Sequence, residues 1–576
     1  MDLHTITSKI LAPFCIVLIA SISAFSQSGS FWDDTDLSLF RSGGSIGLTA
    51  SMYTAHGIDN RRPPGVLQTN ANVNFTALGL RSGFTLNYST DDSGFRQNMN
   101  TINYSAQWRW LTFRAGDVNT RFSDYSLNGT TIRGGYIRAN PGNFSIELIG
   151  GKSKRVVRPS LESAFREPSF DQWAFGTKMG IRGSDGSYFN LSTFYAQDNA
   201  ASLSGEIIEI KPQENLTITP DFRVNLFNDR FTLESQFTAS VFTRDLDGEP
   251  FSASDLGIPV FFTTIYQPRS STHVNYAGKA LAGFRTDFFD LNLGYERIQP
   301  GFMSLGRGTV RNDSETISLS PALRFFQNRL SIRSDVTLGR DNLLGTRFQT
   351  QTNTSIGTNV QITLSEAFNL TTSYNLLLND VTMTNLEGED QPVGGQSQVS
   401  HNFLLQPNFT ILGEDFIHNI AVTGGYLSIS SEFTGEPQAA SSFSSVSYTG
   451  MLSYAITLPA GLTITSSGNY LTNNSDGGGI QNIGANAGTS YALFNRKLTL
   501  GVNLGINRNR LERELPDGAA FTNRFQQLVG GINTSYRFTD KDTFNLTIRT
   551  RTSRVLDGIG NDFTELEGSF RYQRTF

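Results

Sequence analysis

The chain has 576 residues, a formal net charge of −5 and only 17% charged residues. The charged fraction is below the roughly 25% that is usual for soluble domains, and the slightly acidic balance excludes the basic character that a nucleic-acid partner requires. Cys15 is the only cysteine, which excludes disulfide-stapled folds and thiolate metal sites.

Residues 1–26 are predicted to be a secretory signal peptide. Lys9 precedes an apolar run over 10–24, and Ala24 and Ser26 frame a small-x-small cleavage site before Gln27. The run is shorter than the roughly 20 residues of a spanning helix, which favours cleavage over a membrane anchor. We therefore expect an exported protein whose mature chain begins at Gln27.

Residues 27–43 are expected to form a short periplasmic segment before a barrel over 44–576. The segment carries Trp32 and the acidic residues Asp33, Asp34 and Asp36, which suit contact with a periplasmic partner or entry into a lumen. It is too short for the globular plug of a TonB-dependent receptor. A separate periplasmic or lumen-plugging protein is therefore a candidate partner.

From about residue 45 to the end, apolar and polar residues alternate in repeated stretches. Residues 498–506 show the pattern most clearly, because Leu498, Leu500, Val502, Leu504 and Ile506 are separated by Thr499, Gly501, Asn503 and Gly505. The same alternation occurs at 231–241, 289–295, 330–338 and 544–548. Period two predicts strands with one apolar and one polar face.

The connections between these stretches are of two kinds. Short turns are predicted at 78–81, 140–143, 184–186, 228–230, 287–290, 327–329, 365–367, 458–461, 495–497 and 540–542. Phenylalanines flank many of them, as expected at a membrane interface. Longer polar loops, such as 386–396 and 473–479, lie between the hairpins. This asymmetry is typical of outer-membrane barrels, with short periplasmic turns and long extracellular loops.

We therefore predict an all-β fold: a single transmembrane antiparallel β-barrel of about 26 strands (22–26). Such a barrel implies outer-membrane lipid and the barrel assembly machinery of a Gram-negative cell as partners. The chain ends in an alternating strand whose last residue is Phe576. A terminal aromatic resembles the signal by which the assembly machinery recognises its clients.

Two segments carry a family resemblance. Residues 114–129, followed by Ile132, Gly134 and Gly135, and residues 294–306 are similar to stretches of large, uncharacterised outer-membrane barrels of Bacteroidota-type bacteria. The resemblance covers about a tenth of the chain with specificity. It implies a compartment and a fold, and it brings no agreed activity.

Charged residues on the polar face of the predicted strands are candidate lumen residues. They are Glu234, Glu296, Arg333, Asp335, Arg549 and Arg551. In a barrel they would order water and bias ion passage. The alternative is that they pair across strands and only stiffen the wall.

The basic loop over 152–168 is a candidate constriction or a site for an anionic surface glycan. It carries Lys152, Lys154, Arg155 and Arg158, and charged neighbours in the sequence include Arg114, Asp117 and Arg133.

No catalytic, cofactor or metal constellation is predicted. Residues 43–47 match the G-x-S-x-G pattern, but that motif requires a strand-to-helix elbow and here it opens a strand. The five histidines are scattered, without metal-ligand spacing. The sequence therefore favours a porin-like channel or a partner-gated translocation pore for a polar solute or polymer. The alternative is a surface platform for adhesion or assembly, and an enzyme is the least favoured class.

Overall fold

The computed structural model describes residues 40–91, 100–158, 168–203, 210–252, 254, 266–308, 311–384, 392–435, 442–514 and 520–576. The proposed signal peptide and residues 27–39 of the segment 27–43 lie outside these residues. None of the described segments is a helix long and apolar enough to cross a membrane, a finding that does not bear on crossing by strands.

The fold consists almost entirely of strands, joined in one 26-stranded sheet. The first half comprises β1 (Arg41–His56), β2 (Gly65–Ala77), β3 (Leu80–Ser89), β4 (Thr101–Trp108), β5 (Leu111–Asn119), β6 (Thr131–Ala139), β7 (Phe144–Lys154), β8 (Asp171–Arg182), β9 (Tyr188–Asn199), β10 (Glu214–Leu226), β11 (Phe231–Thr243), β12 (Thr272–Arg285) and β13 (Phe289–Ile298).

The second half comprises β14 (Ser314–Phe325), β15 (Leu330–Asp341), β16 (Gln349–Ser365), β17 (Phe368–Thr384), β18 (Pro392–Leu412), β19 (Ile417–Gly435), β20 (Phe443–Thr457), β21 (Leu462–Ser475), β22 (Gly478–Leu493), β23 (Leu498–Glu514), β24 (Ala520–Arg537), β25 (Asp542–Asp557) and β26 (Phe563–Thr575).

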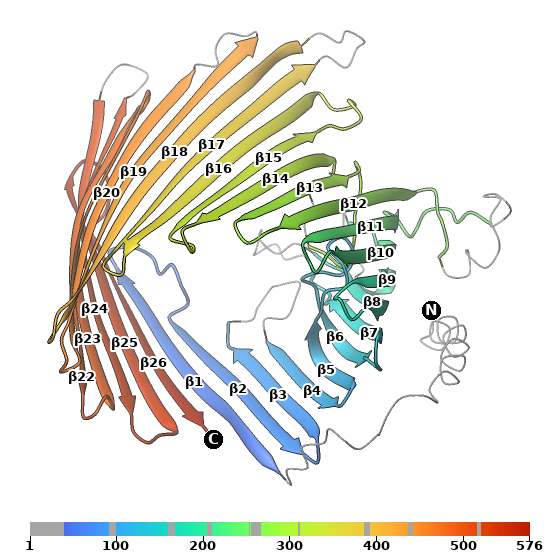
Figure 1. Ribbon diagram of the computed structural model, residues 1–576, viewed down its shortest axis with the longest axis horizontal. Coiled ribbons are helices and arrows are strands. Elements are labelled where there is room, and N and C mark those ends of the chain that lie inside the picture. The colour runs from blue at the N-terminus through green and yellow to red at the C-terminus, as the bar shows by residue number, and fades with distance from the viewer. Residues whose placement is uncertain are drawn as a thin grey trace.

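The sheet closes on itself. Each strand pairs antiparallel with the next, and β26 pairs with β1 from Ser45↔Thr575 to His56↔Thr564 (Figure 1). Backbone hydrogen bonds in both directions between Gly44 and Phe576, of 2.9 and 3.0 Å, fix the seam at the chain end. The predicted fold class, an antiparallel barrel of about 26 strands, is confirmed.

The turns predicted from sequence join successive strands at one end of the barrel. Two further turns, which were not predicted, join strands at this end, at residues 109–110 and 413–416. The opposite end differs from the prediction in detail, because strands run into segments expected to be loops. Residues 473–479 form the end of β21, a two-residue turn and the start of β22. The G-x-S-x-G segment lies within β1, paired on both sides, and forms no elbow.

Alternation gives the wall two faces. On β11–β13 the outer face carries Phe237, Tyr276 and Tyr295, and the rings of Phe237 and Tyr276 stack 5.5 Å apart. On β23 the outer face carries the exposed side chains of Leu500, Val502, Leu504 and Ile506. The inner face carries the residues between them, which are mainly polar. A sheet with an apolar exterior of this kind suits a lipid environment.

Strand length distinguishes two sectors of the barrel, and β1–β3, with 16, 13 and 10 residues, lie between them. The strands of the first sector, β4–β15, have 8–14 residues, whereas those of the second, β16–β26, have 13–21. Figure 1 shows this contrast between the short blue-green strands and the long yellow-to-red ones. The candidate site lies on the inner face of the first sector.

Candidate functional site

The segment 120–130, between β5 and β6, folds against the inner wall. Phe122, Tyr125 and Leu127 are at most 1% exposed, although they lie outside any strand. The segment closes on itself through a 2.9 Å hydrogen bond from the Phe122 amide to the Leu127 carbonyl. Ser123 Oγ accepts a 2.9 Å bond from the Ser126 amide, which tightens the bend.

A second segment, 299–308 between β13 and β14, packs on the first. The Asn128 amide donates to the Gly306 carbonyl at 2.9 Å, and Ser304 Oγ donates to the Ser126 carbonyl at 2.8 Å. We call residues 120–130 and 299–308 together the inner clasp. The two segments are those in which the sequence resemblance was found, so the resemblance follows a contact between segments far apart in the chain.

The clasp buries its apolar side chains against the wall of β6–β13. One buried cluster joins Phe122, Leu127 and Leu305 to wall residues that include Ile149 and Phe194. Gly176 of β8 leaves the space for Phe122, because a Cβ at that position would lie 2.7 Å from the ring. A second cluster joins Tyr125 and Phe302 to Ala277 and Ile298. Fully burying an aromatic side chain stabilises a fold by about 1.5–3 kcal/mol, so the clasp is a firmly packed element.

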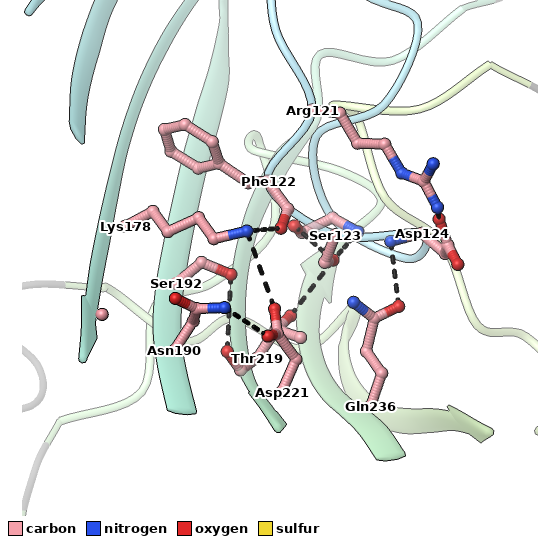
Figure 2. Close-up of polar contacts among 12 residues, drawn as sticks. Arg121, Phe122, Ser123, Asp124, Lys178, Asn190, Ser192, Thr219, Asp221 and Gln236 are labelled. Atoms are coloured by element: carbon pink, nitrogen blue, oxygen red, sulfur yellow. Dashed lines mark hydrogen bonds and ion pairs between the residues drawn. The ribbon is translucent and has the colours of Figure 1, made fainter. Parts of the chain in front are cut away.

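Polar contacts hold the clasp to strands β8–β11 (Figure 2). Lys178 Nζ donates to the Phe122 carbonyl at 2.9 Å and lies 3.7 Å from the Asp221 carboxylate. Asn190 donates to the same carboxylate at 2.6 Å. The Asp124 amide donates to Gln236 Oε1 at 3.0 Å. These wall residues face the interior, since they alternate with the outer-face residues of the same strands.

Charge concentrates at the tip of the clasp. Asp124 forms ion pairs with Arg121 and Lys279, and Arg307 donates to its backbone carbonyl. Burial disfavours the ionised carboxylate, but Lys279 and Arg121 outweigh burial and hold the pKa of Asp124 below its usual value. The Tyr125 hydroxyl donates to Glu296, and burial together with that carboxylate raises the pKa of Tyr125 far above its usual value. The clasp is therefore fixed by ionised groups at neutral pH.

The six candidate lumen charges occupy different environments. Glu296 accepts from Tyr125 of the clasp. Glu234 lies 3.2 Å from Arg223 and lines a cavity of about 620 Å³ together with Arg285 and Asp290. Arg551 lies 3.9 Å from Glu565, and Arg549 is directly opposite Glu567. Because Glu296 is also directly opposite Lys279, four of the six candidates sit beside charges of opposite sign.

Arg333 and Asp335 share the face of β15 that lies opposite the exposed Leu338. In the part of the chain that the structure describes, neither residue forms an ion pair. Among the described residues, they therefore have no ion-pair partner through which they could stiffen the wall.

The basic-loop candidates are only partly described, because residues 159–167 lie outside the described ranges. The Lys152 side chain lies on the outer face of β7, where it pairs with Asp171 at 2.8 Å and lies over the Trp173 ring. A bulge after Lys152 then brings Lys154 into register with the inward-facing Gln172. Arg155 and Arg158 follow β7 in the connection. The segment that demonstrably enters the lumen is the clasp, which sequence reasoning missed.

The second sector has a different inner face, which we call the amide wall. Between the strand ends, its described inward residues on β16–β24 include no charged side chain, and Arg513 and Arg537 stand only at strand ends. Asn, Gln, Ser, Thr and Gly predominate instead. Asn469 donates to Asn482 and Asn482 to Asn509, each at 2.7 Å, so one amide chain crosses β21, β22 and β23.

Glycines leave space for the asparagine side chains of the amide wall. A Cβ at Gly484 would lie 2.1 Å from the Asn507 amide oxygen and 2.4 Å from that of Asn469. The same relation joins Gly505 to Asn486 and Gly531 to Asn503, with distances of 2.2 and 2.3 Å. Asparagine side chains therefore lie flat across neighbouring glycines. The result is a low, uncharged surface of hydrogen-bonding groups.

Among the described residues, no group of three or more His, Cys, Asp or Glu side chains is placed to hold a metal ion.

No protein-family model matches the chain, and no curated protein matches it. Solved structures similar to it include the FrpB iron transporter from Neisseria meningitidis, with 11% identity, 93% of this chain and 81% of that one covered, and a TM-score of 0.36. BauA, the ferric preacinetobactin receptor from Acinetobacter baumannii, has 10% identity, coverages of 92% and 80%, and a TM-score of 0.38. OpdK from Pseudomonas aeruginosa, solved with vanillate, has 9% identity, coverages of 63% and 94%, and a TM-score of 0.28. These values assign neither a family nor a cargo to the chain.

Proposed function

We propose that this protein is an outer-membrane channel that passes a polar, uncharged solute or polymer along the amide wall. The observation that carries the proposal is the uncharged inner face of β16–β24 within a closed barrel. Amide and hydroxyl groups exchange hydrogen bonds with a polar cargo without the strong attraction of an ionic site. Passage requires binding weak enough to permit release.

Insertion in the outer membrane is supported by the outer face. Exposed aliphatic side chains on β23 alternate with inward asparagines, as a lipid-facing strand requires. Phe227, Phe326 and Phe494 at the short turns are 78, 75 and 71% exposed, which suits the aromatic girdle of a membrane interface. The proposal includes export with signal cleavage near Ser26 and Gln27, and assembly by the machinery that reads the terminal strand with Phe576.

The size of the barrel supports passage. Porins of 16–18 strands already enclose an aqueous channel, and diameter grows with strand number. A 26-stranded barrel with the usual strand spacing has a backbone diameter on the order of 50 Å. The clasp covers only the wall of the first sector. Controlled passage through so wide a barrel calls for a second protein that fills or gates the rest, and we include such a partner in the proposal.

Single-channel recording in planar bilayers tests this function. Refolded barrel is expected to give large, steady conductance steps that neutral polyethylene glycols of increasing size reduce progressively. The ratio of cation to anion permeability is expected to lie close to one, because the amide wall selects neither sign. Protein that is correctly folded by heat modifiability yet never conducts would contradict an open channel.

A surface platform is the second candidate, and strand length favours it. A tilted strand crosses a bilayer with about 9–11 residues, whereas β18 has 21. With the short turns in the periplasm, the ends of β16–β25 would project beyond the membrane as a wall. Binding of intact cells to a second surface, lost when this wall is shortened by matched hairpin deletions, would support that role.

A further inference from the structure

We propose that the outer face of β23–β25 binds the phosphates of a glycolipid in the outer leaflet. This inference rests on insertion in the outer membrane as proposed above, but not on transport. Four arginines form the site, which we call the arginine patch: Arg508 and Arg510 of β23, Arg524 of β24 and Arg554 of β25.

The strand register places these arginines side by side. Arg510 is directly opposite Arg524, while Arg508 is opposite Gln526, which is in turn opposite Arg554. Opposed side chains have Cβ atoms about 4.5–5.5 Å apart, so the patch spans about 10 Å across two strand spacings. Like charges directly opposite each other are destabilising. The Arg510–Arg524 pair therefore favours an anion between the two guanidinium groups.

The outward direction follows from alternation. Asn507 and Asn509 of β23 face the lumen within the amide wall, so Arg508 and Arg510 point the other way. Ile506 precedes the patch on β23, and Leu528 lies beside it on β24; both are exposed on the same outer face. The patch therefore borders the apolar belt on the side away from the short turns. With those turns in the periplasm, this is the level of the outer-leaflet headgroups.

Carboxylates neutralise the patch only in part. Arg510 pairs with Glu512, and Arg554 lies 3.9 Å from Asp562 with both side chains largely exposed. Arg508 bonds to the neutral Gln526 at 3.3 Å. Arg524 is directly opposite Asp557 in the strand register but forms no ion pair within the described ranges. Two of the four arginines, Arg508 and Arg524, thus form no ion pair among the described residues.

Other outward charges near the same end are paired. On β13–β15, Glu315 lies 3.4 Å from Arg297 and 2.7 Å from Arg340. On β5–β8, Asp117 lies 2.7 Å from Arg133, and Asp171 lies 2.8 Å from Lys152. Each of these outward basic side chains forms an ion pair, whereas Arg508 and Arg524 on β23–β25 form none among the described residues. Guanidinium groups bind phosphate oxygens through paired hydrogen bonds, and basic clusters beside a bilayer recognise anionic lipid headgroups.

Lipid titration of the refolded full-length barrel in detergent tests the inference. The probes are lipid A with both phosphates, the same lipid without phosphates, and inorganic phosphate. The variant R508Q/R510Q/R524Q/R554Q is compared with R81Q/R549Q/R551Q/R571Q, which removes the same charge from inward-facing positions. We expect phosphorylated lipid A to bind the native barrel and the inward control equally, and the patch variant at least about tenfold more weakly.

Equal affinity of the patch variant and the native barrel would overturn the inference, as would equal binding of the lipid without phosphates. Displacement of lipid A by inorganic phosphate at matched concentration would show an anion site rather than a lipid site, which also contradicts it. The double variant R524Q/R554Q replaces the quadruple one if that fails to fold. Conductance of the patch variant, recorded without lipid A, separates the two proposals. It is expected to equal that of the native barrel even though lipid binding is lost.

Discussion

The two sectors of the barrel use their inner faces in opposite ways. The wall of β6–β13 is covered by the clasp, with Phe122 and Tyr125 almost fully buried and Asp124 held by Lys279. The amide wall of β16–β24 carries no comparable cover among the described residues. It is stabilised by neighbouring strands and by asparagines lying over glycines. The first sector resembles the core of a soluble protein, whereas the second resembles a solvated surface.

The difference shows how one strand pattern serves two purposes. Both sectors alternate apolar outer residues with smaller inner ones. Where the inner residues are glycine and alanine beside a loop with aromatic side chains, as at Gly176 and Ala174, the wall accepts packing from inside. Where asparagines fill the space over glycines, as at Gly484, Gly505 and Gly531, no room is left for such packing. The inner residues therefore decide which sector is anchored and which stays accessible.

The largest expected effect comes from emptying the clasp core. Phe122→Ala leaves a cavity beside Gly176 and is expected to destabilise the closed clasp by about 3–5 kcal/mol. Leu377→Ala, at an inward and partly exposed position of the amide wall, is expected to cost under about 1 kcal/mol. Hydrogen exchange of residues 120–130 and 370–380 measures both. Equal protection in the two variants would remove the distinction between the sectors.

An intermediate effect is expected from the ion pair at the clasp tip. Lys279→Met leaves Asp124 with Arg121 alone, and because the pair is partly exposed the cost is expected to be about 1–2 kcal/mol. Arg333→Met is the matched control, since Arg333 has no ion-pair partner in the described part of the chain. Protease cleavage within 120–130 is expected to accelerate only in the first variant. Similar acceleration in both would mean that Asp124 does not anchor the clasp.

Acid is expected to loosen the clasp. The pKa of Asp124 is lowered in the folded state, so its contribution is present above the unfolded value of about 3.9 and is lost as pH falls through the folded pKa. Protection of 120–130 should therefore be constant between about pH 5 and 8 and should decrease below about pH 4. Asp124→Asn is expected to abolish this step. A clasp that opens near pH 6 instead would point to a different group.

The smallest effect is expected from charging the amide wall. N503D/N507D places two carboxylates on an otherwise uncharged face and is expected to raise cation over anion permeability by about twofold, a modest change because the lumen is wide. N503Q/N507Q controls for side-chain change without charge. Reversal potentials in a salt gradient measure the ratio. An unchanged ratio in the acidic variant would place the conducting path elsewhere.

The barrel itself follows from local patterns, whereas the clasp does not. Alternation such as Leu500, Val502 and Leu504 reports the face of each strand, and Asn and Gly mark most short turns. The turn at 109–110 could not be recognised from the sequence because Arg109 and Trp110 form it in place of the usual turn residues. In the sequence, the feature that indicates the clasp is a polar loop, 120–130, that contains three apolar side chains. Its partner, 299–308, lies far away in sequence, so only the closed wall brings the two together.

Cysteine accessibility tests the central claim, that the amide wall lines an open, water-filled lumen. Cys15 is the only native cysteine, so single cysteines at neighbouring β23 positions report with little background. In proteoliposomes, Asn503→Cys is expected to react with a membrane-impermeant charged thiol reagent and to lose conductance on reaction. Leu504→Cys, which faces the other way, is expected to stay unmodified. Protection of Asn503→Cys together with labelling of Leu504→Cys would contradict the account, because the amide wall would then face away from water.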